Sequence, residues 1–137
     1  MKRLVTLLLA LIMVFAATGA FAADIKVLVN GDEIVFDRGP QIQDDKLMLP
    51  FRFIAEKLGA IVAWDNETKT VFAGMSGTVA TMQIGNKSIF VNDTVISVDV
   101  APTILVDRTM VSEEVLEGAL GVTVSWDKDL NTATITK

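Results

Sequence analysis

Apolar and polar positions follow two different periods along this chain, and each period predicts a different element. Most apolar runs are short and alternate with polar residues, which is typical of strands with one buried face. Two segments instead space apolar residues three and four positions apart, as on one face of a helix. These two faces are Phe51, Ile54, Ala55 and Leu58, and Val115, Leu116, Ala119 and Leu120. The pattern predicts many short strands and two helices of about two turns.

Residues that begin and end helices stand at both segments. Pro50 suits the first helical position, because a missing N–H costs nothing there. Ser112 is placed to cap the second helix with its hydroxyl group, and acidic residues follow it where the helix dipole is positive. Leu58 and Leu120 close the two apolar faces. Gly59 and Gly121 come directly after them, where a left-handed residue ends a helix.

The second half of the chain repeats the first at an offset of 62 residues. Fourteen positions are identical without a gap. Most are turn, cap or core types, so the repeated object is a fold and not an active site. The sequence therefore predicts an α+β protein with antiparallel β-sheets wrapped around two short helices and two pseudo-repeats, at about residues 25–75 and 84–137. The matches include Asn30, Pro40, Leu58, Gly59, Trp64 and Asp65, with Asn92, Pro102, Leu120, Gly121, Trp126 and Asp127.

The first 22 residues have the three parts of a secretory signal peptide. Lys2 and Arg3 precede an apolar run at residues 4–17, and Ala20-Phe21-Ala22 forms a small-x-small cleavage site. The run is shorter than the roughly 20 residues of a membrane-spanning helix, although an uncleaved anchor stays an alternative. We expect a secreted or extracellular protein, free or associated with the cell wall, whose residues 23–137 form one domain.

The amino-acid composition argues against several classes of partner and active site. The chain has 17 acidic residues against 12 lysines and arginines, a net charge of −5, and no basic stripe, which argues against nucleic acid as a partner. It contains no cysteine, which excludes disulfides, and no histidine, which excludes Ser-His-Asp and imidazole-zinc sites.

The first repeat resembles the N-terminal stalk domain of copper amine oxidases. The resemblance rests on Val29-Asn30-Gly31, Pro40, Met48-Leu49-Pro50, Arg52-Phe53-Ile54-Ala55-Glu56, Leu58-Gly59-Ala60 and Trp64-Asp65. The second copy departs, with Asp93 for the glycine and Ser112-Glu113-Glu114 for Pro-x-Arg. The resemblance implies a five-stranded antiparallel sheet around one helix, in a module separate from the catalytic domain. Many secreted bacterial proteins similar to it carry such modules beside envelope-associated domains.

The oxidase chemistry itself does not carry over. That reaction needs copper held by imidazoles and a quinone made from tyrosine, and the chain has neither histidine nor tyrosine. We therefore expect no enzyme activity and no cofactor. Two adjacent carboxylate pairs, Asp44-Asp45 and Glu113-Glu114, leave a carboxylate-dependent hydrolase as the least favoured alternative.

Asp127, Asp129 and Asn131 have the 1, 3, 5 spacing that opens a calcium-binding loop. The glycine expected next is Thr132 instead, and the chain ends before a twelfth-position glutamate. A solvated hairpin turn is the favoured interpretation. A soluble ligand- or calcium-binding protein that uses its acidic turns is kept as the first alternative function.

Trp64 and Trp126 suggest either sugar-stacking platforms or core residues. Trp126 shares its strand face with Val122 and Val124, so strand parity favours the core for both tryptophans.

The favoured function is a secreted, non-catalytic binding or spacer module of the cell envelope, with an envelope polymer or surface protein as partner. The structural prediction that is easiest to contradict concerns the two repeats. Residues 61–96 should form the stalk-like sheet with the second helix, and the C-terminal strands in residues 122–135 should join the N-terminal hairpin in residues 25–36 around the first helix.

Overall fold

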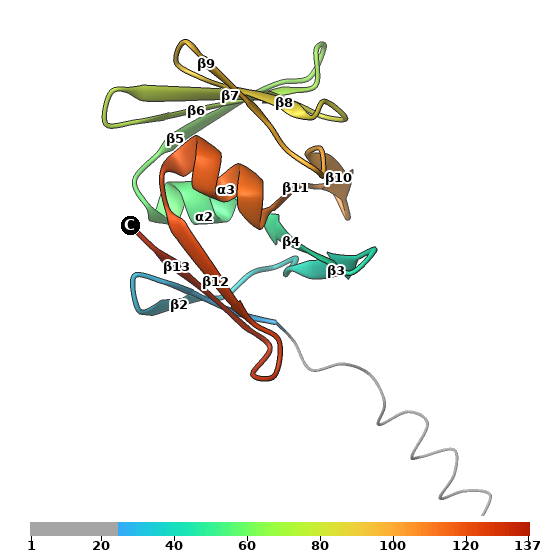
Figure 1. Cartoon of the computed structure of the whole chain (residues 1–137), viewed down its shortest axis with the longest axis vertical. Helices are drawn as coiled ribbons and strands as arrows, with labels where there is room; N and C mark the ends of the chain where they lie inside the picture. Colours follow the sequence, from blue (N-terminus) through green and yellow to red (C-terminus); the bar gives the residue numbers. More distant parts are fainter. Residues whose placement is uncertain (1–24) are drawn as a thin grey trace, which may run out of the picture.

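Three β-sheets and two short helices make up residues 25–137, the part of the chain that this computed structural model describes (Figure 1). The signal peptide expected in residues 1–22 lies outside the described residues. The helices lie in the middle of the molecule, with one sheet above them and another below in the view of Figure 1. Neighbouring strands are antiparallel with one exception, which confirms the α+β class with mostly antiparallel sheets.

The largest sheet has five strands that pair in chain order and form an up-and-down meander. It contains β5 (Ile61–Asp65), β6 (Thr70–Met75), β7 (Thr78–Gln83), β8 (Ser88–Val91) and β9 (Thr94–Ser97). Helix α3 (Glu113–Leu120) packs against β7 and β8. The stalk-like sheet predicted from residues 61–96, together with the second helix, is therefore confirmed.

The second sheet joins the two ends of the described chain. Its order is β12 (Thr123–Asp127), β13 (Thr132–Thr136), β1 (Lys26–Val29) and β2 (Asp32–Ile34). The exceptional parallel pair is β1 with β13, in register from Lys26 opposite Thr132 to Val29 opposite Ile135. This confirms that the C-terminal strands join the N-terminal hairpin.

The first helix contacts the second sheet less extensively than the prediction implies. Helix α3 is the helix that packs against β12. Helix α2 (Phe51–Lys57) lies against β5 and β11 instead, and reaches the second sheet through an ion pair between Lys57 and Asp32 at 3.8 Å.

The third sheet has the order β10 (Thr103–Leu105), β11 (Arg108–Ser112), β4 (Lys46–Pro50) and β3 (Gln41–Gln43). Its two central strands, β4 and β11, run antiparallel, with Leu49 opposite Val111. Each central strand continues directly into a helix, so this sheet fixes where both helices begin. The outer strands have only three residues each, too few for a readable alternation of apolar and polar positions.

The helix ends differ in detail from the prediction. Pro50 is the N-cap of α2 and not its first helical residue. Ser112 is the N-cap of α3, but its side chain makes no capping bond, and its Oγ is buried without a hydrogen-bond partner. Gly59 and Gly121 have φ of +94° and +66° after the last turns, which glycine adopts at little cost, so both glycines end their helices as predicted.

One apolar core lies between the sheets and the helices. Both predicted helix faces contribute to it, and the only member of either face that is not fully buried is Leu58. Each sheet adds fully buried side chains, for example Val27, Met82 and Val111. Burying one such side chain stabilises a fold by about 1.5–3 kcal/mol, which helices of seven and eight residues need in order to persist.

Candidate functional site

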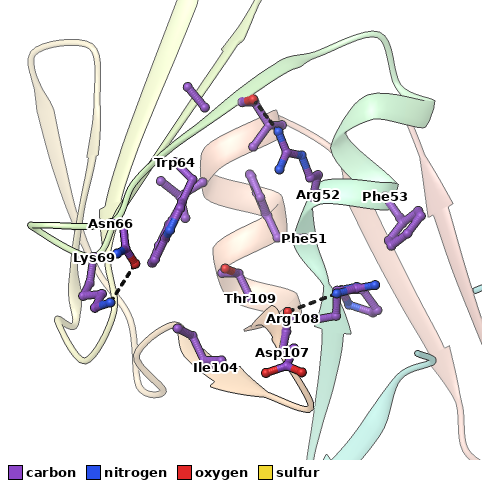
Figure 2. Close-up of a pocket in the computed structure, with 14 residues that line it drawn as sticks. Phe51, Arg52, Phe53, Trp64, Asn66, Lys69, Ile104, Asp107, Arg108 and Thr109 are labelled. Carbon is purple, nitrogen blue, oxygen red and sulfur yellow. Dashed lines mark hydrogen bonds between the residues drawn. The ribbon is translucent and has the colours of Figure 1, made fainter. Parts of the chain in front are cut away.

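A cleft of about 480 Å³ opens where the first turn of α2, strand β5 and the β10–β11 hairpin meet (Figure 2). Its wall includes Trp64 of β5, Asn66 and Lys69 of the following turn, Arg52 of α2, and Asp107 and Arg108 of the hairpin. The cleft thus takes residues from both halves of the chain.

Trp64 lies on the face of β5 that strand parity predicts, but outside the core. It pairs with Val71 of β6 and shares its face with Val62, and all three line the cleft. Because β5 is the edge strand of its sheet, the indole is not covered on every side and is 37% exposed. The prediction that Trp64 is a core residue is therefore wrong. Trp126, in contrast, is partly buried and packs against the core, as predicted.

The β5–β6 turn places a cation next to this tryptophan. The Lys69 ammonium lies 6.0 Å from the centroid of the Trp64 ring and donates a hydrogen bond to Asn66 Oδ1 at 2.8 Å. Asp65 Oδ1 holds the turn by accepting the backbone N–H groups of Glu67 at 2.9 Å and Thr68 at 3.2 Å. In Figure 2 the indole lies between Asn66 and Lys69 on one side and Phe51 on the other.

Arg52 forms part of the opposite wall and ties α2 to β5. Its Nη2 donates to the carbonyl oxygen of Val62 at 3.1 Å, and its Nε lies 3.5 Å from Glu56 Oε1. Arg52 and Glu56 thus form an ion pair four residues apart on α2. About half of each of these two side chains is exposed, so the pair contributes little to stability and leaves the guanidinium accessible.

Arg108 closes the cleft at the hairpin. Its guanidinium donates to Asp37 through Nη2 and to the carbonyl oxygen of Asp107 through Nη1, and it lies 5.9 Å from the ring centroid of Phe53. The hydrogen bond from Arg108 lowers the pKa of the Asp37 carboxyl below its ordinary value. Phe36 in turn meets the Phe53 ring edge-on at 5.9 Å. Arg108 is thus held in position by Asp37.

The cleft differs in charge from the chain as a whole. Its lining includes three cations, Arg52, Lys69 and Arg108, and one carboxylate, Asp107. The chain carries a net charge of −5. Two of these cations are paired with carboxylates outside the lining, Arg52 with Glu56 and Arg108 with Asp37, so the charge that a ligand meets is smaller than this count. Cationic groups beside an exposed aromatic ring suit a ligand with both an apolar face and a negative group.

The calcium candidates lie at the turn that joins β12 to β13. Asp127 Oδ1 accepts the backbone N–H groups of Asp129 at 3.0 Å and Leu130 at 3.1 Å, which makes the segment a hairpin turn between β12 and β13. Asn131, the third candidate, adopts a φ of +53° in the same turn. Within residues 25–137, no three Asp, Glu, His or Cys side chains are grouped closely enough to hold a metal ion.

The two carboxylate pairs lie in different surroundings. Asp44 and Asp45 form the exposed β3–β4 turn, with φ of +50° and +63°. Glu113 and Glu114 line a second hollow of about 280 Å³ at the start of α3. Partial burial raises the pKa of Glu113, and the neighbouring Glu117 adds to the effect. Glu114 Oε1 instead accepts the backbone N–H of Asp99 at 3.2 Å.

Several residues of the cleft could not be found from the sequence. Ile104, Asp107 and Arg108 carry no motif, and they reach the cleft only because β11 pairs with β4 beside the start of α2. Lys69 ends a run of polar residues that is typical of a turn and carries no sign of a site. The one available signal was Trp64, whose position in an edge strand depends on the sheet order.

Comparison with known families agrees with this fold. The profile described as copper amine oxidase N-terminal domain matches residues 28–135, which span all but a few of the described residues. The chain belongs to the copper amine oxidase N-terminal domain family. A comparison with curated proteins found no match.

Membership in this N-terminal domain family concerns the stalk-like module and not the oxidase reaction. The match begins in β1 and ends in β13, so it includes both helices and the whole wall of the cleft. Neither helix of the described part is long and apolar enough to cross a bilayer.

Proposed function

We propose that the protein is a secreted, non-catalytic binding or spacer module of the cell envelope. The cleft beside Trp64 is the observation that supports binding best. It gathers an exposed indole, three cationic side chains and an amide around one hollow, and the pairing of β4 with β11 brings the two halves of the chain together there. A preformed hollow with a few polar groups around an aromatic ring is typical of a binding site.

Retention of the full chain on envelope fractions tests this proposal. Peptidoglycan, secondary wall polymers and surface proteins are offered separately, and the bound chain is measured. We expect enrichment on one fraction that Trp64→Ala abolishes. Phe72→Ala is the matched control, because Phe72 is similarly exposed at 39% but lies on the opposite face of the same sheet. Retention on none of the fractions contradicts an envelope role.

The proposal also includes the absence of catalysis. The carboxylate pairs serve turns and a helix start, and Glu114 already accepts a backbone N–H. A panel of glycoside and peptide substrates checks this, and turnover that Glu113→Gln abolishes would contradict it. Calorimetry with calcium checks the alternative of a cation-binding protein that uses the turn at Asp127.

We also infer that the two halves descend from one duplicated unit. Strands β1, β3, β4 and β5 have the same lengths as β8, β10, β11 and β12, which begin 62 residues later. Left-handed backbone supports the same offset, since Asn30, Asp45 and Lys69 share positive φ with Asn92, Asp107 and Asn131. Asp65 and Asp127 accept equivalent pairs of turn N–H groups.

This inference accounts for the parallel pair in the second sheet. Strand β7 has no counterpart in the second sheet, whose order is β12, β13, β1 and β2. In the five-stranded sheet, β6 and β8 are both antiparallel to β7 and therefore parallel to each other. Their counterparts, β13 and β1, meet directly without an intervening strand, so they pair in parallel. The second sheet is therefore built from strands of both halves of the chain.

A further inference from the structure

We propose that the cleft beside Trp64 binds an acidic saccharide. A sugar ring stacks on the indole, and its carboxylate or phosphate group contacts Arg52 and Lys69. This proposal rests on the binding function proposed above and names the class of ligand that this cleft takes.

Stacking is supported by where Trp64 stands. The ring belongs to an edge strand and is 37% exposed, and the cleft opens beside it. Its neighbours on the same face of the sheet, Val62 and Val71, add apolar lining to the cleft. A pyranose ring has an apolar C–H face that covers an indole while its hydroxyl groups stay at the rim, where polar side chains reach them.

The preference for a negative group comes from donors that remain available. Lys69 uses one N–H on Asn66, and an ammonium group carries three. Arg52 donates from Nη2 to Val62 and faces Glu56 with Nε, so its Nη1 group keeps its donors. Arg108 is committed to Asp37 and to the Asp107 carbonyl oxygen, which makes it a positioning residue for this wall.

The remaining lining fits the neutral parts of a sugar. Asn66, Asp107 and Thr109 place amide, carboxylate and hydroxyl groups around the cleft, and these are the groups that pair with sugar hydroxyls. The volume of about 480 Å³ lies within the range of roughly 300–1,000 Å³ that is usual for small-ligand sites.

The hollow at the start of α3 provides an internal contrast. Its charged lining consists of one cation, Lys46, and the four carboxylates of Asp99, Glu113, Glu114 and Glu117. An anionic saccharide is repelled there and attracted at Trp64, so binding should be confined to one side of the molecule.

Trp64 reports on its own site. The chain has two tryptophans, so Trp126→Phe leaves Trp64 as the only indole emitter. This variant is titrated with galacturonic acid hexamer, with a hexamer of glucose units joined by phosphodiesters, and with neutral glucose hexamer. We expect a saturable change of emission with at least one of the two acidic probes, at an affinity about tenfold or more above that for the neutral probe. The two acidic probes separate a carboxylate ligand from a phosphate ligand, and tightest binding of either one supports the proposal.

Charge variants locate the negative group. Lys69→Gln and Arg52→Gln should each weaken binding of the acidic probe by roughly three- to tenfold, with a smaller dependence on salt. Lys87→Gln is the matched control, because it removes the same charge from an exposed turn outside the cleft and should leave the affinity unchanged. Calorimetry on the unmodified chain repeats the titration independently of Trp126.

Two results would overturn the proposal. One is equal affinity for the acidic and neutral probes. The other is absence of binding to every probe by the unmodified chain. If that chain is still retained on an envelope fraction, the proposed binding function stands and only the acidic saccharide is rejected.

Discussion

The side-chain Oδ1 of Asn30 accepts the backbone N–H of Lys137 at 2.9 Å, which links two residues that lie 107 positions apart. The backbone N–H of Asn30 donates in turn to the carbonyl oxygen of Ile135 at 2.8 Å. Asn92 makes the corresponding pair of bonds with Val79 in the five-stranded sheet. A turn asparagine thus fixes the end of a neighbouring strand in both sheets.

Replacing Asn30 tests how much this link contributes. Asn30→Gly keeps a residue that tolerates the φ of +49° but removes the acceptor. We expect the free energy of unfolding to fall by about 1 kcal/mol, the usual contribution of one hydrogen bond. Urea unfolding measures it. Asn30→Asp keeps an acceptor at the same position and should lose less, and equal losses in both variants would contradict the role of Oδ1.

Deleting residues 123–137 tests whether the halves depend on each other. The deletion removes β12 and β13, and with them the buried side chains of Ala133 and Ile135 in the shared core. We expect amide protection around Ile54 in α2 to fall together with that in α3, as hydrogen exchange measures. Unchanged protection around Ile54 would mean that the two repeats are independent units.

The raised pKa of Glu113 leads us to expect an unusual dependence of stability on pH. Partial burial raises its folded-state pKa above the unfolded value, so the ionised form destabilises the fold above the folded-state pKa. This cost falls as the pH drops through the folded-state pKa and is absent below the unfolded-state pKa. Glu113→Gln should therefore raise the Tm at pH 7, and its advantage over the unmodified chain should vanish near pH 3.

Glu114→Gln is the control for this experiment. Glu114 Oε1 accepts the backbone N–H of Asp99, and an amide oxygen can accept the same bond, so its replacement should change the Tm little. A Glu113→Gln advantage of equal size at pH 7 and pH 3 would contradict the desolvation argument.

Asp37→Asn should strengthen binding of the acidic probe. The carboxylate of Asp37 neutralises Arg108, and its removal frees a cation in the wall of the cleft. We expect affinity to rise by roughly two- to fivefold, the range that exposed charge pairs support. Asp32→Asn is the matched control, because Asp32 pairs with Lys57 and is not part of this wall. Equal gains from both variants would indicate a general effect of net charge.

Most of the fold could be predicted from the sequence, because the repeated residues have strong local conformational preferences. Gly59 and Gly121 end helices by adopting positive φ, and the apolar spacing around Leu116 marks a helix face whatever surrounds it. The third sheet could not be predicted from a local pattern, since its outer strands have only three residues each. Its existence depends on β4 pairing with β11 across more than fifty residues.

The candidate site was harder to predict for the same reason. Strand parity placed Trp64 on the correct face but could not say that β5 is an edge strand. Exposure of the indole follows from that sheet order, as does the approach of Arg108 from the other half of the chain. The side chains of the candidate site are brought together by long-range pairing, on which local sequence patterns carry no information.

The parallel pairing of β1 with β13 also determines how the molecule resists a pulling force. A force that pulls Ile25 away from Lys137 slides the two strands past each other along their length, because their registers run in the same direction. All hydrogen bonds of that ladder then carry the load together, whereas a hairpin pulled open from one end loses its bonds one at a time. We expect single-molecule stretching from these two ends to need a higher force than stretching across β8 and β9, an antiparallel hairpin. Equal forces would contradict this. A module built in this way is suited to bear strain between two points of attachment.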